Sequence, residues 1–207
     1  MGLLLSFLSS LLAAAKDLVS KRLASRLDGT VSTFASFAFA LPYYGVVLAV
    51  LFLLELETLE LSLAFLGLVF LRSITDTFAE ILKMYALSYG DISLVASFFS
   101  LSPLFLLITS PLITGDEVSE FGLAAVGLIV VGSLLMVYRS APGNWGAQKK
   151  GILLALGASV FFSLNSCFDR LAVKQGTPVM AGFAMTLLSA LFLLPLVLMR
   201  RERREAL

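Results

Sequence analysis

Residues 31–54 read VSTFASFAFALPYYGVVLAVLFLL, a run of 24 residues without a charged side chain. An α-helix rises about 1.5 Å per residue, so about 20 apolar residues cross the hydrocarbon core of a membrane. The spanning strands of a barrel need only about 10 residues and alternate in polarity, which this run does not. The stretch therefore predicts a transmembrane helix.

Six further apolar segments of similar length lie on either side of this stretch. They cover residues 2–23, 61–88, 92–113, 121–138, 151–173 and 179–199. Most connections between the segments are short and carry turn residues, so successive helices are expected to be antiparallel neighbours. The predicted fold is all-α: a multi-spanning transmembrane bundle of seven helices.

Composition supports a membrane protein. Of the 207 residues, 59% are hydrophobic and 14% are charged, whereas soluble domains have roughly 45–50% and about 25%. The formal net charge is only +1, which provides no general attraction to DNA or RNA. We expect the lipid bilayer and a small-molecule substrate as partners, and no nucleic acid.

The sequence contains no histidine and a single cysteine, Cys167. The missing histidine excludes Ser-His and Cys-His catalysis and histidine-ligated zinc. The glycine motifs that bind phosphates or dinucleotides are also absent, as are the motifs of the aspartyl and rhomboid intramembrane proteases. We therefore expect no enzyme, no cofactor and no metal site, and we interpret Cys167 as a packing residue.

Basic residues gather on one side of the predicted bundle, which sets its orientation by the positive-inside rule. The other side carries one basic residue, Lys174, among several acidic residues. The ten on the basic side are Lys21, Arg22, Arg26, Arg139, Lys149, Lys150, Arg200, Arg201, Arg203 and Arg204. The basic side is predicted to face the cytoplasm, with the N-terminus outside, and the plasma membrane is the expected location.

The end of the first segment is similar to the end of the sixth. Residues 16–22 read KDLVSKR and residues 168–174 read FDRLAVK, and a proline follows in each copy, Pro42 and Pro195. Five helices separate the two copies, and this odd number makes the second copy enter the membrane from the opposite face. We expect a five-helix inverted repeat, a construction typical of secondary transporters. The alternative is a chance likeness between two amphipathic helix ends.

Six short runs follow one another along the chain in a characteristic order. They are YALSYGDISLVAS at 85–97, LSPLF at 101–105, GDEVS at 115–119, GLIVVG at 127–132, FDRLA at 168–172 and GTP at 176–178. Together they resemble the EamA-type domain of the drug/metabolite transporter superfamily. Glu117 stands where that family has an acidic residue, although Asp116 intrudes between it and Gly115. The resemblance covers most of the chain and implies a carrier of small metabolites or organic compounds that works by alternating access.

The resemblance also implies a domain organisation of ten helices in two halves. Residues 1–140 then form the first EamA-like five-helix repeat, residues 141–150 a loop, and residues 151–207 the first two helices of a second repeat with a basic tail. The second half is expected to be incomplete, completed by a partner chain or a second copy in a homodimer. A non-transporting membrane subunit or a truncated inactive fragment is the alternative to a working carrier. Family members are often drawn with a cytoplasmic N-terminus, whereas the charge count above places the N-terminus of this chain outside.

Four charged residues of the third segment follow helical spacing: Arg72, Asp76, Glu80 and Lys83, at i, i+4, i+8 and i+11. This spacing stacks them on one face, and Arg72 and Asp76 lie near the bilayer middle, where each charge costs about 2.5–3.5 kcal/mol. We interpret this face as the lining of a wet central cavity that handles substrate or a coupling proton, with Asp76 and Glu80 as the protonatable groups. The alternative is a structural ladder of salt bridges that neutralises itself.

Polar residues of the first and sixth segments are expected to face the same space. These candidates are Lys16, Asp17, Ser163, Asn165, Ser166, Asp169 and Arg170. For Lys16 and Arg170 the alternative is an interfacial position, in which the long side chain reaches the lipid headgroups.

Small residues and prolines predict how the helices pack and bend. A small residue recurs every fourth position in the sixth segment, at Gly151, Ala155, Ser159 and Ser163, and such a face lets another helix approach closely. Pro103 and Pro111 interrupt the hydrogen bonding of the fourth segment, so a bend or hinge is expected there.

Overall fold

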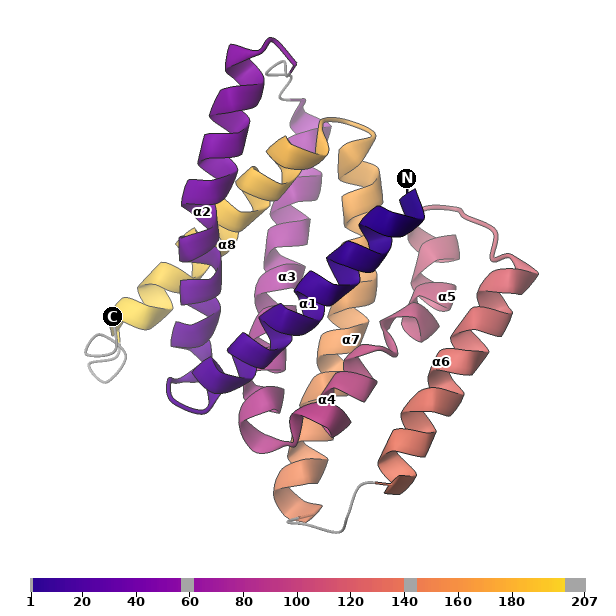
Figure 1. Cartoon of the computed structure of the whole chain (residues 1–207). Coiled ribbons are helices and arrows are strands. Elements are labelled where there is room, and N and C mark those ends of the chain that lie inside the picture. Colours follow the sequence, from indigo (N-terminus) through magenta and orange to yellow (C-terminus); the bar gives the residue numbers. More distant parts are fainter. Residues whose placement is uncertain (1, 57–61, 140–144, 200–207) are drawn as a thin grey trace.

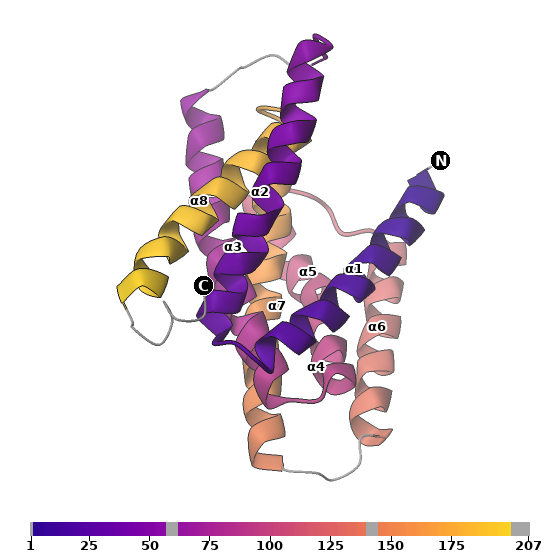
Figure 2. The same ribbon diagram turned by 60° about the vertical axis from the view of Figure 1, so that its left-hand side comes forward.

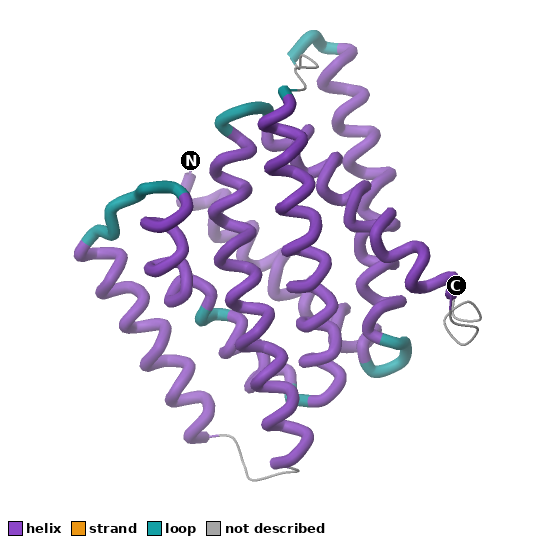
Figure 3. Tube along the Cα trace, turned by 180° about the vertical axis from the view of Figure 1, so that it is seen from behind, coloured by secondary structure: helices purple, strands orange, loops and turns teal. Residues whose placement is uncertain are grey.

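The computed structural model describes residues 2–56, 62–139 and 145–199, and within them the chain is all-helical (Figures 1 and 3). The helices are α1 (Gly2–Ala24), α2 (Gly29–Leu53), α3 (Leu63–Tyr89), α4 (Ile92–Phe99), α5 (Ser102–Ile113), α6 (Glu120–Arg139), α7 (Trp145–Val173) and α8 (Pro178–Met199). Each predicted apolar segment is helical over most of its described residues, so the predicted all-α bundle is confirmed.

Several helices are suited to lipid by length and composition. Four described segments are long and apolar enough to cross a membrane, namely residues 29–53, 92–113, 148–173 and 178–199. Large apolar side chains such as Phe39, Leu112 and Leu128 point outward from the bundle. A surface of this kind matches a bilayer rather than water. The helices α1 and α3 are outside this group of four, and both carry charged residues in the candidate site described below.

The predicted fourth segment is two helices rather than one. Helix α4 ends at Phe99, and α5 begins at Ser102 with Pro103 in its first turn. Proline has no N–H and its ring clashes with the carbonyl four residues earlier, which here belongs to Phe99. The predicted bend is therefore a break at residues 100–101, and Pro111 lies inside α5. Together the two helices still form one apolar stretch of membrane-spanning length.

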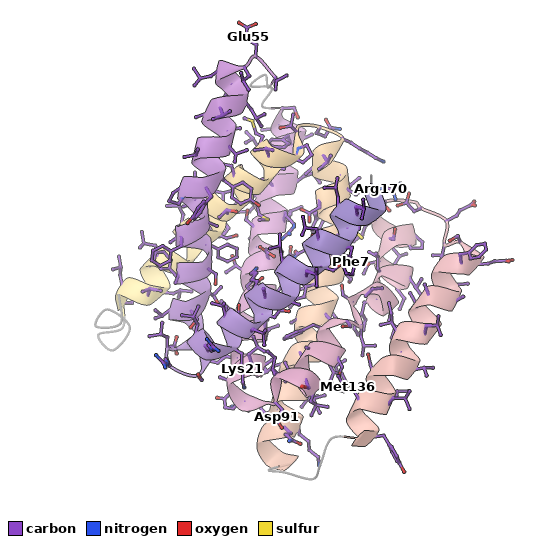
Figure 4. The ribbon with its side chains drawn as sticks, in the orientation of Figure 1. Phe7, Lys21, Glu55, Asp91, Met136 and Arg170 are labelled. Carbon is purple, nitrogen blue, oxygen red and sulfur yellow. The ribbon has the colours of Figure 1, made fainter. Side chains whose placement is uncertain are left out.

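With α4 and α5 counted together as one segment, the helices run alternately up and down (Figure 1). Helices α1, α3 and α6 end at the lower edge of that view, where α2, α4 and α7 begin. In Figure 4 Lys21 and Asp91 lie at this lower edge, and Glu55 and Arg170 lie toward the opposite one. Helices α1 and α7 thus end on opposite sides, as an inverted repeat requires, but the repeat itself and the orientation in the membrane stay predictions.

Helix α7 begins earlier than expected. Residues 145–150 were predicted to lie in the loop 141–150, but they form the first turns of α7. Two contacts hold these turns against the junction of α3 and α4: Gln148 donates a hydrogen bond to Asp91 over 3.2 Å, and the Lys150 ammonium lies 3.9 Å from the ring centre of Tyr89. The remainder of that loop and the basic tail at 200–207 lie outside the described residues.

The long helix α3 lies in the middle of the bundle. It packs most extensively on α7 and also contacts α1, α2, α4 and α8. Ala155, Ser159 and Ser163 of α7 are fully buried, and Gly151 lies against the backbone of Gly90. The expected small-residue face is therefore where α7 meets its neighbours.

Helix α1 is attached to the bundle mainly through its C-terminal half. Ser20 and Ala24 are buried, whereas Leu8 and Leu12 are exposed. The Lys21 ammonium donates hydrogen bonds to the carbonyls of Leu87 and Gly90 at the end of α3. Figure 2 shows α1 leaning away from α2 and α3 toward its N-terminal end. The residues of α1 that contact α3 thus lie between Lys16 and the C-terminal end of α1.

Asp28 caps α2 and joins it to α3. Its Oδ1 accepts a hydrogen bond from the Thr30 N–H over 2.9 Å, and its Oδ2 accepts one from the Tyr85 hydroxyl over 3.1 Å. We expect Asp28→Ala to lower the free energy of unfolding by about 1 kcal/mol, because an uncapped N–H is left at the helix start. Unfolding in detergent micelles, titrated with dodecyl sulfate, measures this change. Asp28→Asn, which can still cap the helix, is the matched control, and equal losses in both variants would contradict the prediction.

Candidate functional site

The charged face of α3 borders a cavity in the middle of the bundle. Asp76 is the central residue of the 27-residue helix, and Arg72 and Glu80 lie one turn to either side of it. The cavity has a volume of about 290 Å³. Its lining comes from α1, α2, α3, α7 and α8 and consists of Lys16, Ser36, Phe37, Ala40, Tyr44, Arg72, Asp76, Glu80, Phe162, Met185 and Thr186.

At one end of the site Arg72 joins α3 to α7. Its Nη1 lies 2.8 Å from Asp76 Oδ1, and its Nε donates a hydrogen bond to Asp169 Oδ1 over 2.7 Å. The Asn165 amide donates to Asp76 Oδ1 over 2.9 Å and accepts from the Thr75 hydroxyl over 2.6 Å. Arg72 and Asp76 are therefore held by two residues of α7 spaced one turn apart.

At the other end Glu80 and Lys83 join α3 to α1. The Lys16 ammonium donates to Glu80 Oε1 over 3.3 Å. The Lys83 ammonium lies 2.8 Å from Asp17 Oδ1 and 3.8 Å from Glu80 Oε1. Lys83 is buried but does not line the cavity, so three of the four charged residues predicted on this face border the hollow.

Both cationic partners of Glu80 approach the same oxygen, Oε1. The second oxygen, Oε2, is buried and has no hydrogen-bond partner among the residues that the structure describes. Glu80 as a whole is only 6% exposed. Leaving a buried carboxylate oxygen without a donor is costly, so an unpartnered oxygen of a residue that lines a cavity points to a ligand or water nearby.

Three of the predicted site residues lie away from the cavity. The Ser163 hydroxyl is buried and donates to the Val160 carbonyl over 2.7 Å. Ser166 is exposed and donates to the carbonyl of Phe162. Arg170 pairs with Asp116 at the start of the link between α5 and α6. Among the described residues, no hydrogen bond or ion pair joins Ser163, Ser166 or Arg170 to the charged residues of α3 that line the cavity.

The remaining predicted residues take part in the charged cluster. Lys16 lines the cavity, although its side chain is 55% exposed. Asp17 pairs with Lys83, and Asp169 pairs with Arg72. Asn165 reaches the cluster through Asp76. Lys16 therefore binds a carboxylate of α3 instead of occupying a purely interfacial position.

Sequence reasoning missed the part of the wall that comes from α2 and α8. Tyr44 and Phe37 of α2 and Met185 and Thr186 of α8 line the cavity. These residues belong to uniformly apolar helices and carry no charge, so nothing in their spacing distinguishes a cavity-facing side from a lipid-facing side. One local signal exists: a Cβ at Gly182 would lie 2.9 Å from the Tyr44 ring, so glycine leaves room for this ring between α2 and α8.

A second hollow is larger but has different chemistry. It lies between α4 and α6, has a volume of about 390 Å³, and is lined by serine and apolar side chains such as Ser93, Ser97 and Ser133. No charged residue is part of this described lining. Ser97 and Ser133 donate to backbone carbonyls, which satisfies their hydroxyl protons. The cavity beside α3 is therefore the better candidate site.

Comparison with known proteins identifies the family. A family model described as the EamA-like transporter family matches residues 1–138, which is more than half of the chain. The comparisons with curated proteins and with solved structures gave no match. The family match agrees with the helical fold and the apolar segments that suit a membrane. This integral membrane protein thus belongs to the EamA-like transporter family.

Proposed function

We propose that this chain carries small organic compounds across the plasma membrane by alternating access, with the cavity beside α3 as the site for substrate and coupling proton. One observation carries the proposal: charged side chains at the centre of α3, which packs among helices that suit a membrane, border a hollow of about 290 Å³. Charges at this depth are expensive and are retained where they serve a pathway. The family match supports membrane transport of small compounds as the general activity.

The ion pairs on α1 suggest how access alternates. Lys16 and Asp17 hold the middle of α1 against Glu80 and Lys83, while Ser20, Lys21 and Ala24 anchor its C-terminal end. Protonation of Glu80 would remove the charge that attracts Lys16 and so weaken this attachment. Movement of α1 would then open the cavity on one side, while the contacts of α3 with α7 stay in place. Asp76, between Arg72 and Asn165, is the second group that can take up a proton.

Transport by reconstituted protein tests this proposal through Asp76→Asn. The full chain is placed in vesicles with an imposed pH gradient and screened with a panel of small amines, acids and neutral compounds, and the compound accumulated most becomes the probe. We expect Asp76→Asn to lose gradient-driven accumulation. It should keep its fold, because Arg72 retains its pair with Asp169.

The control removes the same charge elsewhere. Glu117→Gln, at an exposed residue of the α5–α6 link, should leave accumulation unchanged. Accumulation by Asp76→Asn equal to that of the unchanged chain would remove Asp76 from the mechanism. If the unchanged chain inserts and stays monodisperse but accumulates no compound of the panel, the carrier proposal is wrong and a non-transporting subunit is favoured.

A further inference from the structure

We infer that the cavity beside α3 binds an organic ammonium ion, with Glu80 Oε2 as the acceptor for its N–H groups. The inference rests on the proposed function and narrows it, because it assigns a chemical class of substrate to the same site. It begins from the unpartnered oxygen. Glu80 lines the cavity, is more than nine-tenths buried, and uses only Oε1 for Lys16 and Lys83. Glu80 thus borders the hollow while one of its oxygens, which can only accept, is buried without a donor among the described residues.

The charge balance of the cluster favours a cation. The ion-pair network joins three cations to four carboxylates, which leaves one excess negative charge. Its members are Lys16, Arg72, Lys83, Asp17, Asp76, Glu80 and Asp169. Glu80 has two cationic neighbours and Arg72 has two carboxylates, so no cation of the network lacks a partner. A monovalent cation in the cavity would neutralise the excess in a region of low dielectric.

The walls suit an ammonium group attached to an apolar body. Phe37, Tyr44 and Phe162 contribute aromatic rings to the lining. Phe162 already lies near a cation, with the Lys83 ammonium 5.9 Å from its ring centre, and aromatic faces attract cations. The hydroxyls of Ser36 and Thr186 donate to carbonyls of their own helices, so they have only lone pairs left to offer a ligand. A primary ammonium group has three N–H donors, which matches acceptors of this kind.

An anion fits the same site less well. Nη1 of Arg72 is also buried without a hydrogen bond among the described residues, but it lies 2.8 Å from Asp76 Oδ1, so its charge is already opposed by a carboxylate. Arg72 Nε is paired with Asp169, and Lys16 is paired with Glu80. A carboxylate ligand would therefore compete with existing ion pairs and add to the excess negative charge. Oε2 of Glu80 would remain without a donor.

Three probes of nearly equal size but different charge test the inference. Benzylamine is a cation near neutral pH, benzyl alcohol is neutral and benzoate is an anion. Equilibrium binding to the full chain in detergent micelles is measured by titration calorimetry. We expect benzylamine to bind about 10- to 100-fold more tightly than either of the others, because a hydrogen bond to a charged group contributes that much to affinity. Glu80→Gln should weaken benzylamine binding by a similar factor.

The controls separate a lost site from a lost fold. Glu117→Gln removes an exposed carboxylate and should bind benzylamine like the unchanged chain. If Glu80→Gln does not fold, the ranking of the three probes on the unchanged chain decides the question. Equal binding of benzylamine and benzoate, or benzylamine binding unaffected in a folded Glu80→Gln protein, would overturn the inference.

Binding and transport also fail in different ways. In one case benzylamine binds through Glu80, but the vesicles accumulate neither benzylamine nor any other compound of the panel. That result would support the ammonium site and overturn the carrier proposal. Accumulation of a neutral or anionic compound, without benzylamine binding, would leave the carrier standing and overturn the ammonium site.

Discussion

Replacing Arg72 by Met is expected to lower the free energy of unfolding by about 3–5 kcal/mol. Arg72 holds Asp76 at 2.8 Å and Asp169 at 2.7 Å in the middle of the bundle. Without the guanidinium group, the carboxylate of Asp76 stays buried with only the amide of Asn165 as a donor among the described residues. A buried charge that loses its partner is strongly destabilising, because neither lipid nor protein replaces the lost water.

Two further variants isolate the cause. The double variant Arg72→Met/Asp76→Asn removes both charges. Its free energy of unfolding should lie within about 1 kcal/mol of that of the unchanged chain. Asp169→Asn should lose about 1 kcal/mol or less, because the Asp169 side chain is 50% exposed and is solvated in either state. Titration with dodecyl sulfate in micelles measures all three. If Arg72→Met and the double variant lose equal stability, packing of the long side chain rather than charge explains the effect.

Gly151→Val is expected to have the second large effect. A Cβ at Gly151 would lie 3.1 Å from the backbone nitrogen of Gly90 and 3.2 Å from the carbonyl oxygen of Ala86. Backbone atoms at the end of α3 cannot rotate away as a side chain does, so α7 must move off α3 along their extensive contact. We expect the free energy of unfolding to fall by about 1–3 kcal/mol, the usual range for overpacking.

The matched control is Gly127→Val in α6. Gly127 is exposed and a Cβ there would meet no described atom within 4 Å. Since valine has the higher helix propensity of the two residues, this variant should be as stable as the unchanged chain or slightly more so. A loss of stability at Gly127 as large as at Gly151 would show that helix propensity or membrane insertion, and not the α3–α7 contact, is responsible.

The sequence predicted the helices well because hydropathy is a local property. The expected segment 31–54 corresponds to α2 at Gly29–Leu53, and 179–199 corresponds to α8 at Pro178–Met199. The errors have tertiary causes. The start of α7 was missed because its first turns are polar and are held by Asp91 and Tyr89, which are far away in the sequence. The break before α5 was foreseen as a bend at Pro103, but whether a proline bends or ends a helix depends on the neighbouring helices.

The candidate site was predictable in part. Spacing alone brought Arg72, Asp76 and Glu80 to one face, because a helix repeats every 3.6 residues. Asp169 and Arg170 show where spacing fails: they are adjacent on α7, yet Asp169 reaches Arg72 and Arg170 reaches Asp116. Residues one position apart point about 100° apart around a helix, so only one of them can face α3. Which one does so is decided by how α7 packs, and no single-segment pattern contains that information.

The distance along the chain between Arg72 and its partners has a consequence for how the protein is made. Arg72 and Asp169 are 97 residues apart, and Asp76 and Asn165 are 89 residues apart. At ribosomal rates of about 5–20 residues per second, α3 therefore leaves the ribosome roughly 5–20 s before the residues of α7 that bind it. During that interval the pair between Arg72 and Asp76, one turn apart on the same helix, is the contact that α3 brings with it. Integration of α3 into the bilayer is thus expected to wait at the translocon until α7 emerges.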